Sequence, residues 1–277
     1  MYLMIQGTMS NVGKSTLTLA LCRYFTNKGL NVYPFKSQNI SGKFIETENG
    51  KLAGAQYLQA IACKRPPEPT MNPLLIVPKE GKLQAYFLGE FIGTIYSRKY
   101  MYEEKSELFK KIIEILKELD NKHDLIIIEG AGACAEPNLK DKEIVNMRIA
   151  KAVKSPVLLI SDISLGGAFA QIAGTMELLD GEEKKLIKGF IFNKFKGDTS
   201  LLEDYPQRLA QRYGIHYLGT IPYFENKLPD EDLKTTKRQE VDILKHTEEV
   251  EREIEKIANH FVSHIDIEKL EKILKEH

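Results

Sequence analysis

A lysine and a serine stand together at the end of a glycine-bounded loop near the start of the chain. The loop reads Gly7-Thr-Met-Ser-Asn-Val-Gly13-Lys14-Ser15, between a strand-like run and an amphipathic stretch. Backbone N–H groups of such a loop, and of the helix after it, point at phosphate oxygens. Lys14 can reach the β- and γ-phosphates, and the Ser15 hydroxyl can bind Mg²⁺. The loop predicts binding of ATP together with Mg²⁺.

The spacing within the loop is unusual, because five residues (8–12) separate its two glycines where the common pattern has four. The flanking strand and helix still meet the requirement of the motif. An ordinary glycine-containing turn is the alternative. The predicted ATP contacts are Thr8, Ser10, Asn11, Val12, Gly13, Lys14, Ser15 and Thr16, with Asn193, Lys194 and Pro222 from later in the chain.

Three further polar residues follow strand-like runs and could assist phosphoryl transfer. Lys36 is a cation suited to the γ-phosphate and an attacking carboxylate, although a solvated lysine is the alternative. Glu129 is a hard carboxylate suited to Mg²⁺, so Ser15 and Glu129 are the predicted metal ligands. Asp162 either binds metal or substrate or caps the helix that begins near Gly167. The predicted catalytic residues are Lys14, Lys36, Glu129 and Asp162.

The amide of Asn193 can match the donor and acceptor edge of adenine. A turn-capping role is the alternative for this residue. Cys134 lies beside Glu129 in the sequence, but a cysteine nucleophile needs a base, and no glutaminase-type sequence surrounds it. A catalytic role for Cys134 is therefore not expected.

Short apolar runs alternate with helical patterns along the chain. The runs lack polar alternation, as in strands buried on both faces of a parallel sheet. The predicted strands are Tyr2–Gln6, Asn31–Phe35, Leu125–Ile128, Pro156–Ile160, Gly189–Phe192 and Tyr217–Ile221. The predicted helices are Lys14–Lys28, Leu52–Cys63, Glu104–Asn121, Lys140–Val153, Gly167–Leu179 and Leu201–Tyr213. This order predicts an α/β fold: a doubly wound, mostly parallel sheet with helices on both faces.

One segment departs from this alternation. The runs Leu83–Leu88 and Phe91–Ile95 flank Gly89-Glu90, which predicts a small β-hairpin insertion. Residues 225–238 are polar and predict a loop. Residues 239–277 predict two charged helices broken near Ser263-His264. We expect one ATP-binding domain over residues 1–238, with a helical extension over 239–277 packed on it.

Composition limits the functional classes. Lysine plus arginine and aspartate plus glutamate both number 39, so the formal net charge is zero. That balance argues against nucleic-acid or anionic-membrane binding. The three cysteines are widely spaced, which favours free thiols in a reducing compartment. With neither a signal-peptide pattern nor a membrane-length apolar run, the expected location is the cytoplasm.

Several motifs, in order from residue 3 to about residue 233, resemble those of one enzyme family. The five-residue spacing is similar to that of dethiobiotin synthetase and of the cobyrinic and cobyric acid amidotransferases. Within that group the chain most resembles the synthetase domain of cobyric acid synthase. The matching blocks are Pro34-Phe-Lys36-Ser-Gln38-Asn39, Ala55-Gln56-x-x-Gln59-Ala60, Met71-Asn72-Pro73, Tyr102-x-x-Lys105-x-x-Leu108, Glu129-Gly-Ala-Gly132, Ala135-Glu136-Pro137-Asn138-Leu139, Asp162-Ile-x-x-Gly166-Gly167-x-Phe169-Ala170, Gly174-Thr175, Lys188-Gly-Phe-Ile-x-Asn193-Lys194-Phe195-x-Gly197-Asp198 and Leu218-Gly-x-Ile-Pro222-Tyr223.

The resemblance implies a P-loop fold and an ATP-dependent amide ligase. ATP would phosphorylate a corrinoid side-chain carboxylate, and ammonia would then displace the phosphate. The implied substrate contacts are Gln38, Asn39, Glu136, Asn138, Gly166 and Gly167. A loop-structuring role is the alternative for Glu136 and Asn138. A corrinoid resembling cobyrinic acid a,c-diamide is the implied substrate, and a homodimer is expected. Relatives carry a fused glutaminase domain, so we expect ammonia here to come from a separate glutaminase subunit or from solution.

Two positions depart from the family pattern. Lys51 stands where the family has a glutamate suited to Mg²⁺ or substrate, and Glu46 or Glu48 could substitute for it. Leu165 stands where the family has an arginine that could hold a substrate carboxylate. The nucleotide end of the site is therefore predicted more firmly than the substrate end.

Two other functions fit parts of the sequence. A dethiobiotin synthetase-like carboxylate ligase is compatible with the loop and with Glu129, but not with the 34–39 and 162–170 blocks. A partition-type regulatory ATPase would carry a second lysine early in the loop, and residues 8–11 hold none.

Overall fold

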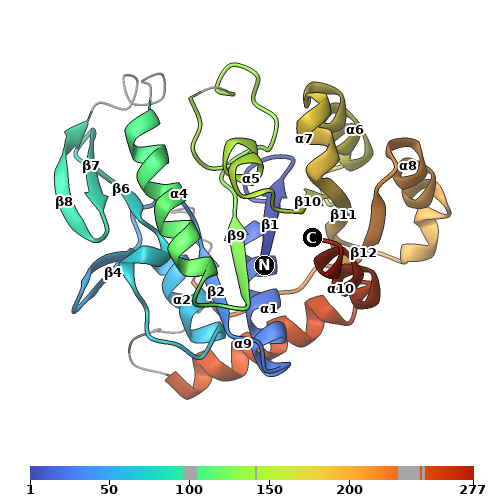
Figure 1. Ribbon diagram of the computed structural model, residues 1–277. Helices are drawn as coiled ribbons and strands as arrows, with labels where there is room; N and C mark the ends of the chain where they lie inside the picture. The colour runs from blue at the N-terminus through green and yellow to red at the C-terminus, as the bar shows by residue number, and fades with distance from the viewer. Residues whose placement is uncertain (96–104, 141, 230–243, 245–246) are drawn as a thin grey trace.

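The protein is described here from a computed structural model, which covers residues 1–95, 105–140, 142–229, 244 and 247–277. Its centre is a parallel sheet in the order β12-β11-β10-β1-β9-β2 (Figure 1). The strands are β1 (Tyr2–Gly7), β2 (Val32–Phe35), β9 (Leu125–Glu129), β10 (Val157–Asp162), β11 (Ile187–Phe195) and β12 (His216–Pro222). All six predicted strands are present, and the predicted α/β class is confirmed.

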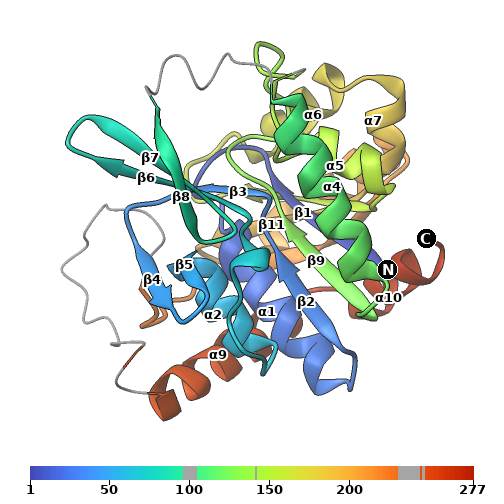
Figure 2. The same cartoon turned by 60° about the vertical axis from the view of Figure 1, so that its left-hand side comes forward.

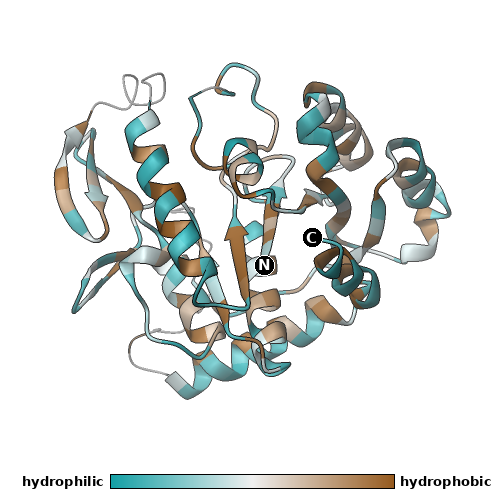
Figure 3. Cartoon of the chain, viewed as in Figure 1, coloured by the Kyte–Doolittle hydropathy of each residue, from teal (hydrophilic) through white to brown (hydrophobic). Residues whose placement is uncertain are grey.

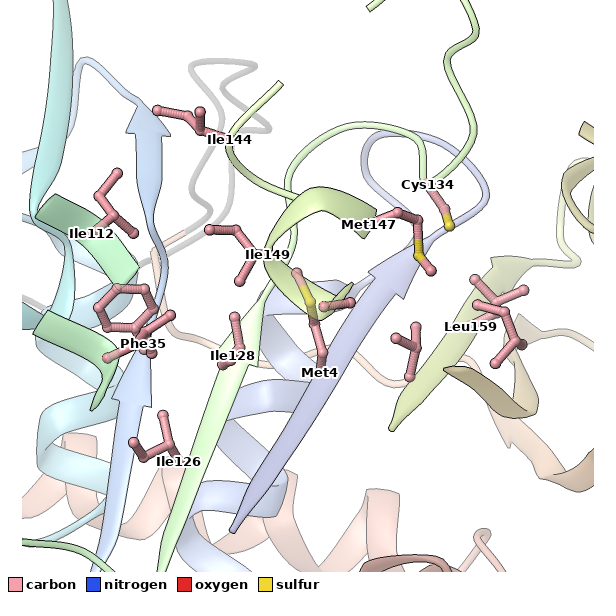
Figure 4. Packing of buried hydrophobic residues seen from close by; sticks show 14 of the residues in the cluster. Met4, Phe35, Ile112, Ile126, Ile128, Cys134, Ile144, Met147, Ile149 and Leu159 are labelled. Atoms are coloured by element: carbon pink, nitrogen blue, oxygen red, sulfur yellow. The ribbon is translucent and has the colours of Figure 1, made fainter. Parts of the chain in front are cut away.

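Helices cover both faces of this sheet, because successive side chains of each strand point to opposite sides. On one side, Leu3 and Ile5 pack with α1 (Lys14–Asn27), α9 (Thr247–Val262) and α10 (Ile267–Lys275). The other side packs against the helices α4 (Ser106–Asp120), α5 (Met147–Val153), α6 (Ala168–Leu178) and α8 (Tyr205–Tyr213). Figure 4 shows Met4, Ile128 and Ile149 in this second layer, and β9 is strongly apolar in Figure 3.

The predicted hairpin is confirmed, but it belongs to a larger structure. The hairpin strands β7 (Lys82–Phe87) and β8 (Glu90–Ile95) extend a sheet of order β3-β6-β7-β8 (Figure 2). That sheet begins with β3 (Gln38–Ile40) and β6 (Leu74–Lys79), which pair in parallel. A separate hairpin of β4 (Phe44–Thr47) and β5 (Gly50–Ala53) leads into α2 (Gly54–Ala62). The strands β3, β4, β5 and β6 were not predicted from the sequence.

Three predicted helices need correction. The helix predicted over Leu52–Cys63 begins at Gly54, because residues 52–53 pair with β4. The helix predicted over Leu201–Tyr213 is split into the 3-10 turn Thr199–Leu202 and α8, with Glu203 between them at φ 48°. Pro206 lies in the first turn of α8, where proline is well tolerated.

The helix predicted over Lys140–Val153 is wrong in its first half, since α5 begins only at Met147. The Glu143 carboxylate accepts hydrogen bonds from the backbone N–H groups of Val145, Asn146 and Arg148. These bonds hold the residues between Glu143 and the start of α5 in a turn instead of a helix. A short helix, α7 (Gly181–Leu186), was also missed; a capping box of Asp180 and Glu183 starts it.

The two predicted C-terminal helices are present as α9 and α10. α9 packs along α1, and Arg23 Nη2 lies 2.5 Å from Glu251 Oε2. The boundary proposed between residues 238 and 239 lies outside the described residues, as do Tyr102, Glu104 and residues 230–238 of the predicted loop. The division into a domain and an extension therefore stays a prediction. No helix within the described residues is long and apolar enough to cross a membrane.

Candidate active site

The glycine-bounded loop connects β1 directly to α1, as its motif requires. Gly13 has φ 102° and precedes the first turn of the helix. Lys14 folds back over the loop: its Nζ lies 2.9 Å from the carbonyl oxygen of Gly132 and 3.1 Å from that of Met9. The loop and the 130–132 segment after β9 therefore face each other across a lysine ammonium group.

Glu129 ends β9 and lies at the centre of a buried cluster. Its Oε1 accepts hydrogen bonds from Ser15 Oγ and from Lys36 Nζ, each at 2.7 Å. Lys36 follows β2, which pairs in parallel with β9, so the carboxyl ends of these two strands lie side by side. Glu129 is fully buried and Lys36 is nearly so, so the solvated alternative for Lys36 is excluded.

Two glutamine side chains hold the other oxygen of Glu129. Gln59 Nε2 donates to Oε2 at 2.6 Å, and Gln56 Nε2 lies 3.4 Å from it. Both glutamines were noted within a family motif, but no role was predicted for them. The available signal was a pair of amides three residues apart, which share one face of a helix.

A cavity of about 510 Å³ opens beside the phosphate loop. Eleven of the predicted site residues line it: Ser10, Asn11, Gly13, Lys14, Ser15, Thr16, Lys36, Gln38, Asn39, Glu129 and Lys194. The lining brings the loop, the ends of β2 and β9 and the start of β3 around one space. Its volume suits a small ligand with phosphate groups.

Three other predicted nucleotide contacts form hydrogen bonds that hold the loop in place. Thr8 Oγ1 lies 2.8 Å from Gln171 Oε1 and 3.0 Å from Ser161 Oγ. Asn193 Nδ2 donates to the Val12 carbonyl oxygen at 2.8 Å, directly beneath Gly13. Thr8, Val12 and Asn193 are not among the residues that line the cavity.

Asp162 is not among the residues that line the cavity, but its partner Lys194 is. Its Oδ2 pairs with Lys194 Nζ at 2.9 Å, and Lys194 in turn donates to the Asn11 carbonyl oxygen. Its Oδ1 accepts from Ser164, so the alternative of capping the helix after Gly167 is wrong. Burial alone would raise the pKa of Asp162, but the Ser164 bonds and the Lys194 charge outweigh it and leave that pKa lowered.

The remaining predicted residues are spread more widely. Pro222 ends β12, where its carbonyl oxygen lies 3.0 Å from His260 Nε2. Gly166 and Gly167 both have positive φ in the turn before α6, beside the exposed Leu165. Glu136 lines a second cavity. Pro222, Asn138, Gly166 and Gly167 are absent from the linings of both cavities.

The second cavity, of about 610 Å³, adjoins the first. The two share the lining residues Ser10, Gln38, Ile40, Ala131 and Gly132. Three lysines (Lys105, Lys140 and Lys142) and three glutamates (Glu136, Glu143 and Glu183) line the second cavity, and Cys134 lies in its wall. Cys134 is buried, and that burial raises the pKa of its thiol. This disfavours a thiolate nucleophile at neutral pH, in agreement with the sequence.

The donor atoms beside the loop fit a magnesium ion bound with a nucleotide. Within the described residues, no group of three or more His, Cys, Asp or Glu side chains could hold a metal by itself. Mg²⁺ commonly takes one or two protein ligands and completes its shell with phosphates and water. Ser15 Oγ and Glu129 Oε1, 2.7 Å apart at the cavity, supply such a pair.

Lys51, which replaces a glutamate of the family pattern, lies on β5 opposite Glu46. Its ammonium pairs with the Glu46 carboxylate and lies 4.3 Å from the centre of the Phe44 ring. Glu46 and Glu48 line neither cavity. The geometry thus gives no support to the idea that either one replaces the missing glutamate.

Known proteins resemble this chain in sequence over most of its length. A family model described as the CobQ/CobB/MinD/ParA nucleotide binding domain matches residues 3–235. A probable cobyric acid synthase of Thermococcus kodakarensis is 55% identical over 83% of this chain and 48% of its own length. A cobyric acid synthase of Desulfitobacterium hafniense is 44% identical over 83% of this chain and 45% of its own length.

The chain thus spans about half the length of these curated relatives. Among solved structures, the MinD cell division protein of Aquifex aeolicus overlaps 95% of this chain and 97% of its own, at 14% identity and a TM-score of 0.43.

Proposed function

Because this chain belongs to the CobQ/CobB/MinD/ParA nucleotide-binding domain family, we propose that it is an ATP-dependent ligase that activates a carboxylate for amide formation. The observation that carries the proposal is the cluster of Ser15, Lys36 and Glu129 beside the phosphate loop. A hydroxyl, a cation and a carboxylate lie together at the cavity beside the phosphate loop, as phosphoryl transfer would require.

The acceptor is proposed to be a corrinoid carboxylate, because the similar proteins of Thermococcus kodakarensis and Desulfitobacterium hafniense are named cobyric acid synthases. The larger cavity is its proposed site. It adjoins the phosphate cavity through Gln38 and Gly132, so an acceptor there would meet the γ-phosphate.

The proposed reaction has two steps. A carboxylate oxygen of the acceptor attacks the γ-phosphorus of ATP, the bond to the β-phosphate oxygen breaks, and ADP leaves. Ammonia then attacks the acyl carbon, loses a proton and releases inorganic phosphate. Lys14 and Lys36 would neutralise the charge that builds on the transferred phosphoryl group. Bound Mg²⁺ would supply charge neutralisation at the β- and γ-phosphates, held by Ser15 and Glu129.

Asn193 and Lys194 would act mainly by shaping the loop, since both hydrogen bond to loop carbonyl groups. Contact of Asn193 with the adenine stays part of the proposal. Asp162 would fix Lys194 rather than bind the metal, because its oxygens already pair with Lys194 and Ser164.

The test is turnover of purified protein with ATP, Mg²⁺, ammonium chloride and cobyrinic acid a,c-diamide. We expect ADP release that depends on the corrinoid, and an amidated corrinoid by mass spectrometry. Lys14→Met should lower turnover by about 100-fold or more, because a lost charge-stabilising donor costs about that much. If the folded protein releases no ADP and forms no amidated corrinoid, the proposal is refuted.

The same assay separates the two alternatives. ADP release stimulated by diaminopelargonic acid plus bicarbonate would indicate a dethiobiotin synthetase-like enzyme. Turnover stimulated by lipid or DNA, without any carboxylate, would indicate a regulatory ATPase. Neither alternative has an observation in its favour that the ligase lacks.

A further inference from the structure

The two carboxylate oxygens of Glu129 lie in different surroundings. Oε1 accepts from Ser15 and Lys36, which both line the phosphate cavity. Oε2 instead accepts from side chains of α2, which lies on the other side of the carboxylate. One oxygen therefore belongs to the cavity, and the other is tied to a helix that the cavity does not include.

The amides that hold Oε2 have a fixed direction. Asn39 Nδ2 donates to Gln56 Oε1 at 3.0 Å, and Gln56 Nε2 lies 3.4 Å from Gln59 Oε1. That arrangement leaves Gln59 Nε2 for Glu129, at 2.6 Å. Turning the Gln59 amide around would set its oxygen against a carboxylate oxygen, which is repulsive. Gln56 and Gln59 are fully buried, so water cannot replace the lost bonds.

We propose that Gln59, oriented by Gln56, is a positioning residue that turns Glu129 so that Oε1 faces a nucleotide-bound Mg²⁺ ion. The proposal rests on the proposed Mg²⁺–nucleotide site but not on the identity of the acceptor. Without the Gln59 donor, Oε2 would be buried without its strongest partner, and the carboxylate would rotate to recover one. Partners in the second layer around a metal commonly fix its ligands in this way.

Gln59→Met tests the proposal, because methionine has nearly the length of glutamine but cannot donate. The measurement is the affinity for ADP and for a non-hydrolysable ATP analogue by titration calorimetry, once with Mg²⁺ and once with EDTA. The quantity of interest is the factor by which Mg²⁺ tightens binding. In Gln59→Met we expect this factor to fall about 10-fold or more. The affinity in EDTA should stay within about twofold of the parent.

Gln207→Met is the matched control, since Gln207 is an exposed residue of α8. It should leave the Mg²⁺ factor unchanged. Thermal unfolding reports whether each variant folds. If Gln59→Met does not fold, Gln56→Met takes its place, with a smaller loss expected because its contact with Oε2 is longer.

An unchanged Mg²⁺ factor in a folded variant would overturn the positioning role. So would an equal loss of affinity with and without Mg²⁺, because the glutamine would then shape the cavity rather than orient Glu129. A parent protein that binds nucleotide without any effect of Mg²⁺ would instead overturn the proposed metal site itself. The two failures are therefore distinguishable.

Discussion

Lys36 Nζ and Glu129 Oε1 form an ion pair 2.7 Å apart, with side-chain exposures of only 5% and 0%. The pair joins the ends of two adjacent parallel strands, β2 and β9. Buried charges of this kind are tolerated only when each is paired and hydrogen bonded. The same pair is thus both a structural requirement and the proposed reaction centre.

Removing only the lysine should therefore destabilise the protein. We expect Lys36→Met to lower the free energy of unfolding by about 3–5 kcal/mol, because it leaves a buried carboxylate without its counter-charge. Denaturant unfolding measures the change. The double variant Lys36→Met/Glu129→Gln should recover much of the loss. Equal stability of Lys36→Met and the parent would contradict the prediction.

Gly13 should not tolerate even a methyl group. Its φ of 102° disfavours other residues, and a Cβ there would lie 2.3 Å from Asn193 Nδ2. Gly13→Ala should cost about 1–2 kcal/mol from backbone strain alone and should abolish measurable nucleotide binding. Gly181→Ala, at an open position of α7, is the control. Full ADP affinity in Gly13→Ala, measured by calorimetry, would show that the loop is more adaptable than its geometry implies.

Asp180 should contribute to the loss of folded-state stability at acid pH. A hydrogen bond from Lys140, followed by one from the Glu183 backbone, lowers the pKa of Asp180 from 3.8 to about 2. A carboxyl group with a lowered pKa in the folded state stabilises it fully above pH 3.8, and this stability is lost as the pH falls to about 2.

Asp180→Asn should accordingly be less stable than the parent near neutral pH and should lose less stability between pH 3.8 and about 2. Urea unfolding at a series of pH values measures both slopes. Parallel slopes for the two proteins would mean that the Lys140 contact does not contribute to the stability of the folded state.

The Cys134 thiol should be unreactive, although Cys134 lies close to Glu129 in the sequence. Because burial raises the pKa of its thiol, iodoacetamide should label it slowly in the folded protein and rapidly after unfolding. Cys134→Ala should retain ATP turnover, since no step of the proposed reaction uses the thiol. Rapid labelling of the native protein together with loss of turnover would point to a catalytic thiol.

The sequence by itself determined the central sheet and the loop. Runs such as Leu125–Ile128 are apolar without alternation, and such a pattern requires burial on both faces whatever the rest of the chain does. The loop motif and the positions of Lys36 and Glu129 after strands are also local features. Strand ends of a parallel sheet meet at one edge, so these residues were expected to converge.

Only the tertiary structure decided how each side chain is used. Glu129 contacts Ser15 and Gln59, which are 114 and 70 residues away in the chain. Asp162 turned toward Lys194, and Glu143 replaced a predicted helical turn with its own hydrogen bonds. Hydrophobic periodicity is a local property and can be read along a chain. The partner of a buried polar group depends on which distant elements pack beside it, and the packing of the whole chain determines that.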